Sequence, residues 1–436
     1  INDIDIKGTL HYENKEGRII LKLLRPELFL NQNYMKKNNI ITGTLDIGLD
    51  VTLFNNRCIS SKYIGGEIVS GHYISFEADY VIFNHGYLNS YEFDELEFTV
   101  ENAIFWSGFH TIERTNIGEY KIKTLDQKSI ISMYGAKIEF SVYLNNGLDM
   151  FPVDEETKVT FRLLVKIVSK RKQRAEYFID VRNKILSLIS FATKDNVNVE
   201  KQILFNYNDT FEFFGDTQYE HKIIYTNGCR RAIIGTNCTD YNFFLADIKD
   251  QDDLSTKLNL LDPVFNLYAS KFRYNDMPKE MVFLNMIQAI ETFHSRFFYN
   301  DKKTDFIKSI KCYIGNEIKY EEIKKLLLSP AQMDNNCKHI NLVSRVIDLL
   351  IRGNNELFKY YYEERIKFAQ DIVNTRHYFT HYGQEKENKA LKGDKLDEAI
   401  EVLILILDYH ICKVLGVNNE RKIEEHLNEI KIQYHN

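Results

Sequence analysis

The stretch DIKDQDD, residues 247–253, separates two parts of the sequence that have different hydrophobic periods. On its N-terminal side, from residue 4 to about residue 168, apolar and polar residues alternate with a period of two, which is typical of β-strands. On its C-terminal side apolar residues recur every three or four positions, as in amphipathic helices. The sequence therefore predicts an α+β protein with two domains, at residues 1–253 and 254–436.

The N-terminal part is predicted to be mainly β. A helix is expected at residues 175–193, where apolar residues take helical spacing, and short strands follow it at 203–214 and 223–225. We expect the strands to form a β-sandwich or a partly open barrel. Clear alternation, with one turn signal at 145–147, is found at residues 4–7, 51–54, 73–76 and 137–142.

The C-terminal part is predicted to be an all-α bundle. Pro278 suits the first turn of a helix, and Gly416 can close another helix in the left-handed conformation. The expected helices span residues 254–272, 278–299, 305–313, 320–328, 338–351, 356–382, 396–415 and 420–432.

Composition indicates a soluble protein of the reducing cytoplasm. No apolar run approaches the roughly 18 residues that a membrane span needs. The six cysteines are scattered without a C-x-x-C pair, which argues against a disulfide framework and against a zinc ribbon. We therefore expect a cytoplasmic protein without membrane partners.

The net charge of −6 provides no overall field that would attract nucleic acid, so any grip on RNA must be local. One dense basic cluster is expected in a loop between a strand and a helix. Such clusters usually form solvated loops, and contact with RNA phosphates is the alternative. Its members are Lys166, Lys170, Arg171, Lys172 and Arg174.

The stretch NTRHYFTH, residues 374–381, carries the most specific chemical signal. It places Arg376, His377 and His381 within six residues of one predicted helix. RNA supplies its own nucleophile, the 2′-hydroxyl, so a histidine that moves protons and an arginine that stabilises phosphoryl charge can cleave it. Arg376 fits the charge-stabilising role and His381 the proton transfer. This chemistry requires no metal and no cofactor.

Helix geometry makes one copy of this set incomplete. Arg376 and His381 should point about 140° apart, whereas His377 and His381, one turn apart, should share a face. If two such helices pack across a two-fold axis, both histidines and both arginines can converge on one cleft. We therefore expect a homodimer or a higher homo-oligomer, and activity that depends on it.

Other interpretations of the motif stay open. The spacing recurs at Arg421 and His426, where the intervening residues are typical of an exposed helix face with local ion pairs. His377 and His381 at i, i+4 could instead bind zinc, although no Glu or Cys follows at zinc-site spacing, or they could form a structural pair. Glu291, an acid on an otherwise apolar helix, could orient a motif residue or lie on an exposed face.

These features resemble those of the ApeA-like HEPN proteins, bacterial anti-phage factors that act by abortive infection. The resemblance is carried by TRHYFTHY (375–382), by the opening IKGTL (6–10) and by residues 51–106, and the part from about 278 onward resembles the HEPN domain. It implies a dimeric, metal-independent ribonuclease in which Arg376 and His381 are the motif pair. His377 stands where the family often has Asn. The resemblance also implies that Glu291 lies near the motif, and that the β domain senses phage or restrains the nuclease.

Two functional hypotheses follow. The first is an RNA endonuclease that stays silent until the N-terminal domain registers a phage-derived trigger and then cuts host RNA, with transfer RNA loops as candidate targets. The second is a non-catalytic sensor or binding protein whose helical domain only dimerises or holds RNA. Cleavage of purified RNA in the presence of EDTA distinguishes the two.

Overall fold

The structure is a computed structural model of the 436-residue chain. It describes residues 8–13, 18–24, 39–46, 48, 50–64, 71–78, 80–84, 92–100, 103–109, 112–116, 119–122, 128–146, 159–197, 199–206, 220–225, 241–248, 253–273, 276–298, 341–353 and 365–435.

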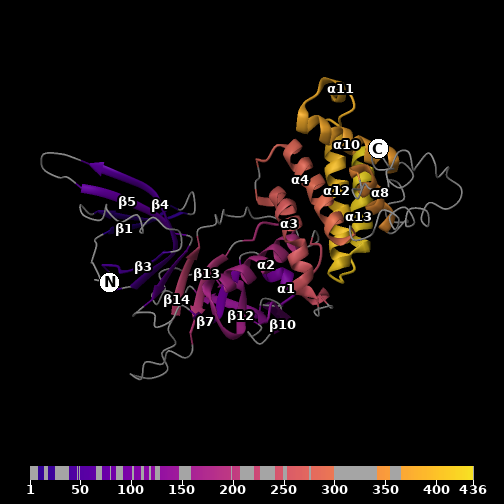
Figure 1. Cartoon of the computed structure of the whole chain (residues 1–436). Helices are drawn as coiled ribbons and strands as arrows, with labels where there is room; N and C mark the ends of the chain where they lie inside the picture. Colours follow the sequence, from indigo (N-terminus) through magenta and orange to yellow (C-terminus); the bar gives the residue numbers. More distant parts are fainter. Residues whose placement is uncertain are drawn as a thin grey trace. The chain divides into compact units, whose positions relative to one another are not determined.

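The chain forms two compact units whose segments alternate along the sequence. The β unit comprises Ile1–Ile104, Phe109–Asn183 and Val197–Ile233. The helical unit comprises Phe105–Gly108, Lys184–Asn196 and Ile234–Asn436. The α+β class predicted from the change of period is confirmed (Figure 1). The predicted domain boundary after residue 253 stays a prediction.

The β unit is built on one large antiparallel sheet. In the part of the chain that the structure describes, twelve strands join it, in the order β1-β2-β5-β4-β6-β14-β13-β7-β12-β11-β10, and β3 also pairs with β4. The strands β8 (Ile112–Asn116) and β9 (Glu119–Ile122) pair separately. The sheet strands are β1 (Gly8–Glu13), β2 (Arg18–Leu24), β3 (Asn39–Thr44), β4 (Asp50–Ile64), β5 (Gly71–Ala78), β6 (Tyr80–Asn84), β7 (Glu92–Val100), β10 (Lys128–Met133), β11 (Ala136–Asn146), β12 (Val159–Arg174), β13 (Val199–Phe205) and β14 (Glu220–Tyr225).

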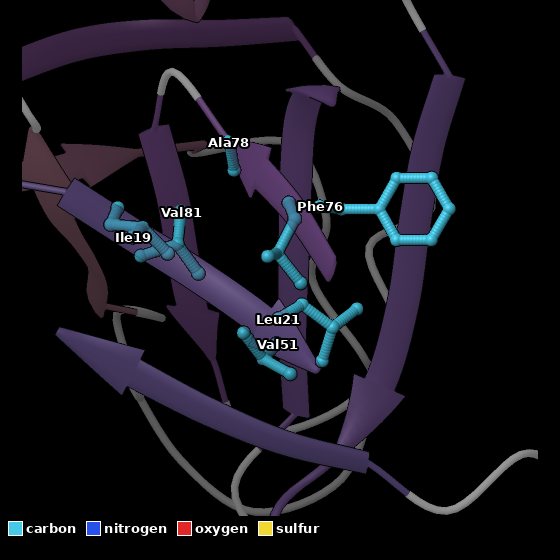
Figure 2. Close-up of a cluster of buried hydrophobic side chains, with 7 residues drawn as sticks. Ile19, Leu21, Val51, Phe76, Ala78 and Val81 are labelled. Carbon is cyan, nitrogen blue, oxygen red and sulfur yellow. The ribbon is translucent and has the colours of Figure 1, made fainter. Parts of the chain in front are cut away.

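The long strand β4 curls the sheet. Its residues 50–54 pair with β6, whereas 57–64 pair with β5. Asn55, between these two stretches, has a left-handed backbone with φ of 54°, and such irregularities bend a strand and increase its twist. The curled sheet encloses a core drawn from β2, β4, β5 and β6, whose strands run in different directions around it (Figure 2). Of the two predicted forms, a β-sandwich and a partly open barrel, the structure therefore has the partly open barrel. The core residues are Ile19, Leu21, Val51, Leu53, Phe76, Ala78 and Val81.

The predicted elements of this part agree with the structure where it describes them. Residues 51–54, 73–76 and 137–142 lie in β4, β5 and β11, and the predicted helix is α2 (Ala175–Thr193). The strands expected at 203–214 and 223–225 overlap β13 and β14. Residues 4–7, Gly147 and 207–219 lie outside the described residues.

The prediction of a basic loop before α2 is wrong. All five members of the basic cluster lie within β12, which runs directly into α2. Inward-facing Leu163, Val165 and Ile167 keep the period of two, and the pairing of β12 with β7 shifts register between Val168 and Gln173. Exposed Lys170 and Arg171 fall within that shift, where a strand can bulge without ending.

The helical unit is centred on α12 (Asp394–Val414). Residues 402–412 of this helix are all buried, as expected of a helix surrounded by others, and Figure 1 shows it alongside α4 and α13. Gly416 closes it with φ of 76°, as predicted, whereas Pro278 is the residue that precedes α4. The other helices are α1 (Ile104–Ser107), α3 (Leu254–Arg273), α4 (Lys279–Phe297), α8 (Leu342–Arg352), α10 (Arg365–His381), α11 (Gln384–Glu387) and α13 (Glu420–His435).

Six of the eight helices predicted for the C-terminal part therefore correspond to α3, α4, α8, α10, α12 and α13. The helices expected at 305–313 and 320–328 lie outside the described residues, as do 338–340 and 356–364. Among the described helices, none is both long enough and apolar enough to cross a membrane.

A buried carboxylate in the helical unit connects several of its elements through hydrogen bonds and an ion pair. Asp408, in the middle of α12, accepts hydrogen bonds at Oδ1 from Tyr268 Oη at 2.7 Å and from Asn242 Nδ2 at 3.1 Å. Its Oδ2 lies 2.9 Å from the Lys194 ammonium. Burial and the nearby Asp408 charge raise the pKa of Tyr268 well above its ordinary value, so this phenol remains a donor. The network ties α12 to α3 and to the segments around 194 and 242.

Candidate active site

Helix α10 carries the motif, and its buried residues lie along one side. Ala369, Ile372, Thr375 and Phe379 form its buried stripe, and the Phe379 ring meets Phe283 of α4 with centroids 6.0 Å apart. This spacing of three and four residues is that of an amphipathic helix, so the remaining motif positions project away from the core. The burial of α10 thus decides which motif side chains are accessible.

His377 and His381 lie on the exposed face of α10. Their rings are 6.3 Å apart between centroids and within 24° of parallel, which confirms the shared face predicted from their spacing. Partial burial lowers the pKa of His377, and the positive charges of Arg376, Lys386 and His381 lower it further. This imidazole is therefore mainly neutral at neutral pH and can accept a proton.

Arg376 points to a different side of the helix, toward α4. Its Nη2 lies 3.8 Å from Oε2 of Glu291, and the two side chains are 36% and 30% exposed. Of the two roles considered for Glu291, this geometry favours orientation of a motif residue. The contact is long and partly exposed, and ion pairs of this kind are weak.

Glu291 is positioned by the packing of α4 against α8. Its backbone carbonyl accepts a hydrogen bond from Arg345 Nη1 at 3.0 Å. One turn along α4, Nε2 of the buried His294 lies 2.8 Å from Oδ2 of Asp348 in α8. Nε of Arg352 lies 2.9 Å from the same oxygen. A buried, paired carboxylate of this kind fixes the register of two helices.

The chain folds back against α10 directly after the motif. The helix ends at His381, and Tyr382 adopts a left-handed backbone with φ of 48°. Thr375 Oγ1 then accepts a hydrogen bond from the Leu391 amide at 2.9 Å, and Lys386 Nζ reaches Asn374 Oδ1 at 3.4 Å. These contacts bring the positively charged Lys386 close to the histidines. The helix end at residues 382–383 was predicted, but the left-handed residue is the tyrosine and not Gly383, whose φ is −71°.

The structure therefore brings the two histidines together, and Arg376 with Glu291, but it does not place Arg376 beside His381. Sequence reasoning missed Thr375, Lys386 and Tyr382. For Tyr382 the ordinary signal points to the wrong residue, since the left-handed position at a helix end is usually taken by Gly itself, which here is Gly383. No short-range pattern shows that Thr375 and Lys386 meet their partners.

The basic cluster belongs to the β unit, and its first member, Lys166, is already paired. Lys166 Nζ lies 2.8 Å from Glu95 Oε1 and also contacts Glu97. Lys172 donates to Asn206 Oδ1 at 2.8 Å. The assignment of Lys166, Lys170, Arg171, Lys172 and Arg174 to RNA binding stays a prediction, and these pairings leave the exposed Lys170, Arg171 and Arg174 as its main support.

The second match to the motif spacing lies on an exposed face of α13. The Arg421 side chain is 91% exposed and pairs with Glu425 one turn away at 2.9 Å. The local ion pair expected there is confirmed, whereas Ile423 within the match is buried and Lys422 donates to the Tyr241 carbonyl. In the described part of the chain, no group of three or more His, Cys, Asp or Glu residues is arranged to hold a metal ion.

Comparison with known families covers most of the chain. A family model described as ApeA N-terminal domain 1 matches residues 1–256, and one described as Apea-like HEPN matches residues 284–421. The second match contains Glu291, Arg376, His377 and His381. No curated protein matches the chain, and neither does any solved structure.

Proposed function

Because the chain belongs to the family of ApeA-like HEPN proteins, we propose that it is a metal-independent RNA endonuclease that cuts host RNA during abortive infection. The family fits anti-phage defence, and its HEPN domain belongs to a group of ribonucleases. The observation that carries the proposal is the pair of exposed, nearly parallel imidazoles on α10 with the motif arginine at the edge of the same helix.

The two imidazoles can divide the proton transfers. Neutral His377 takes the proton of the 2′-hydroxyl, and the 2′-oxygen attacks the adjacent phosphorus. The bond from phosphorus to the 5′-oxygen breaks, and His381, as the general acid, donates a proton to the leaving 5′-oxygen. The products are a 2′,3′-cyclic phosphate and a 5′-hydroxyl. A guanidinium stabilises the charge that develops on the phosphoryl oxygens.

That guanidinium comes from a second protomer. Within one chain, Arg376 faces Glu291 while the histidines face away from the core, so the three side chains do not surround one phosphate. A two-fold axis beside α10 would bring the arginine of each protomer to the histidines of the other. We therefore propose a homodimer, or a higher oligomer built from it, as the active form.

We also propose that the β unit receives a phage-derived trigger and releases the nuclease, since a constitutively active enzyme would kill its host. Transfer RNA loops are candidate substrates, because unpaired nucleotides let the backbone reach the in-line geometry that the 2′-oxygen needs. Both assignments rest on the family and on RNA chemistry.

The decisive experiment is cleavage of total RNA by the full chain, isolated from uninfected and from phage-infected cells, with and without EDTA. We expect fragments ending in 2′,3′-cyclic phosphate that persist in EDTA and disappear in Arg376→Ala and His381→Ala. Arg421→Ala and His426→Ala, at the same spacing on α13, are the matched controls and should cleave normally. Undiminished cleavage by both motif variants would refute the site. RNA binding without products would favour the non-catalytic sensor, and loss of cleavage in EDTA would favour zinc held by His377 and His381.

A further inference from the structure

We propose that Tyr378 and Tyr382, with Lys386 and Lys392 beside them, form a platform that stacks an unpaired RNA base next to the scissile phosphate. The inference rests on the proposed nuclease function and deepens it, because it assigns single-stranded RNA as the substrate class. It concerns side chains on the same exposed surface of α10 and the turn after it, outside the three motif residues.

Tyr382 has an unusual combination of features. It follows His381 directly, its surface is 67% exposed, and its backbone is left-handed with φ of 48°. A bulky residue in that conformation costs free energy that glycine would avoid, and glycine is the next residue in the chain. An exposed aromatic ring held in a costly conformation beside a candidate active site points to a use for the ring.

The rings at the end of α10 form two pairs, one of histidines and one of tyrosines. Tyr378 and Tyr382 lie with centroids 5.5 Å apart at 67° to each other, and Tyr378 adjoins the histidines on the helix surface. The His377–His381 pair shows a similar centroid spacing of 6.3 Å. A strand whose phosphate lies at the histidines therefore has its neighbouring base within reach of the tyrosines.

Two lysines add positive charge to this surface. Lys392 Nζ lies 5.7 Å from the Tyr378 ring centroid, and Lys386 is close enough to the histidines to lower the pKa of His377. Lys392 also contacts Glu387 at 3.1 Å, but both side chains are exposed, and such pairs exchange readily for a phosphate. Aromatic rings interleaved with cations are the usual elements of single-strand binding, where bases stack and the backbone is neutralised.

This chemistry selects against duplex RNA. In an A-form helix the bases are stacked on one another and the major groove is too narrow for side chains, so no base is available to a tyrosine. A loop or an unpaired end offers a base that can leave its stack. The rival occupant of an exposed aromatic surface is the second copy of this chain, and the experiment separates the two.

The test measures binding of a fluorescent single-stranded 2′-O-methyl oligonucleotide to the full chain by anisotropy. This probe lacks the nucleophile, so binding is separated from cleavage. Tyr382→Gly removes the ring while relieving the left-handed backbone, and it should weaken binding roughly tenfold. Tyr382→Phe keeps the ring and should bind as the wild type does. Ile432→Ala, which truncates a 65% exposed side chain on α13, is the matched control and should also bind normally.

The outcomes are distinct. Two results together support the platform. The wild type binds the probe only weakly once the probe is annealed to its complement, and among the three variants only Tyr382→Gly loses affinity for the single-stranded probe. Equal affinity of wild type and Tyr382→Gly, or no binding by either, overturns it. Dissociation of the oligomer in Tyr382→Gly, seen by size-exclusion chromatography with light scattering, overturns it in favour of a protomer contact. If binding follows the prediction while RNA is never cleaved, the platform stands and the nuclease proposal fails.

Discussion

The guanidinium of Arg376 lies beside the carboxylate of Glu291, with Nη2 of the arginine 3.8 Å from Oε2 of the glutamate, while His381 projects from another side of α10 against His377. These two motif residues, only five positions apart in the sequence, therefore have different neighbours. The histidines form the proposed proton-transfer pair, and the arginine is turned toward the neighbouring helix. This separation is what makes a partner protomer necessary in the proposed mechanism.

Complementation between two inactive variants tests that arrangement. Arg376→Ala and His381→Ala should each be inactive alone, but a mixed dimer contains one site with an intact arginine and intact histidines. The isolated mixed dimer should therefore show about half of wild-type cleavage. We would measure it after co-expression with two affinity tags and isolation of the doubly tagged species. Absence of any restored cleavage in that species would place both residues of a working site in one chain.

The neighbouring charges of His377 predict a shift in the pH profile. A general base must be neutral, so kcat/KM falls as the pH drops through the pKa of His377, and burial with nearby positive charges holds that pKa below 6.5. Lys386→Gln removes one of those charges and should move the acid limb to higher pH. Lys389→Gln, an exposed lysine three residues further along, is the matched control. An acid limb that stays fixed in Lys386→Gln would assign the base to another group.

The histidine pair could be predicted from sequence because helix geometry alone puts residues one turn apart on a shared face. The contact between Arg376 and Glu291 could not, since it depends on how α10 and α4 pack and joins residues 85 positions apart in the sequence. Only the presence of an acid on an apolar helix hinted at it. The same holds for Thr375, whose partner Leu391 lies beyond the end of the helix.

For the basic cluster, the sequence led to a wrong prediction of local structure. Five positive residues within nine positions look like a solvated loop, but a strand with one face exposed can carry such residues, and β12 does so at its register shift. Sequence also gives no sign that Lys166 meets Glu95 and Glu97 of β7, because cross-strand partners are set by topology.

Glu291→Gln tests whether this residue orients the arginine. Because the contact is long and partly exposed, we expect kcat/KM to fall less than about fivefold. The substitution should have no further effect in the Arg376→Ala background, as measured by a double-mutant cycle on binding of the 2′-O-methyl oligonucleotide. Glu425→Gln, which removes the same kind of pair on α13, should leave cleavage unchanged. A loss as large as that of Arg376→Ala would instead give Glu291 a direct part in the reaction.

Asp408 should matter for stability and not for chemistry. Replacing it with alanine leaves the charge of the largely buried Lys194, 14% exposed, without its partner and removes the acceptor of Tyr268 and Asn242. Breaking a buried pair of this kind costs about 3–5 kcal/mol. We expect Asp408→Ala to lower the melting temperature of the helical unit markedly, as followed by circular dichroism at the helical minimum.

The comparison that decides the Asp408 prediction is with Arg421→Ala, which breaks an ion pair on the exposed face of α13 and should not shift the melting temperature measurably. Each variant breaks one ion pair, but the pair at Asp408 is buried and the pair at Arg421 is exposed. The difference between their melting temperatures therefore measures the effect of burial. Equal, small effects would mean that water enters the site and screens Lys194. In that case α12 would owe its position to apolar packing alone, and the segments around 194 and 242 would be free to move without disturbing it.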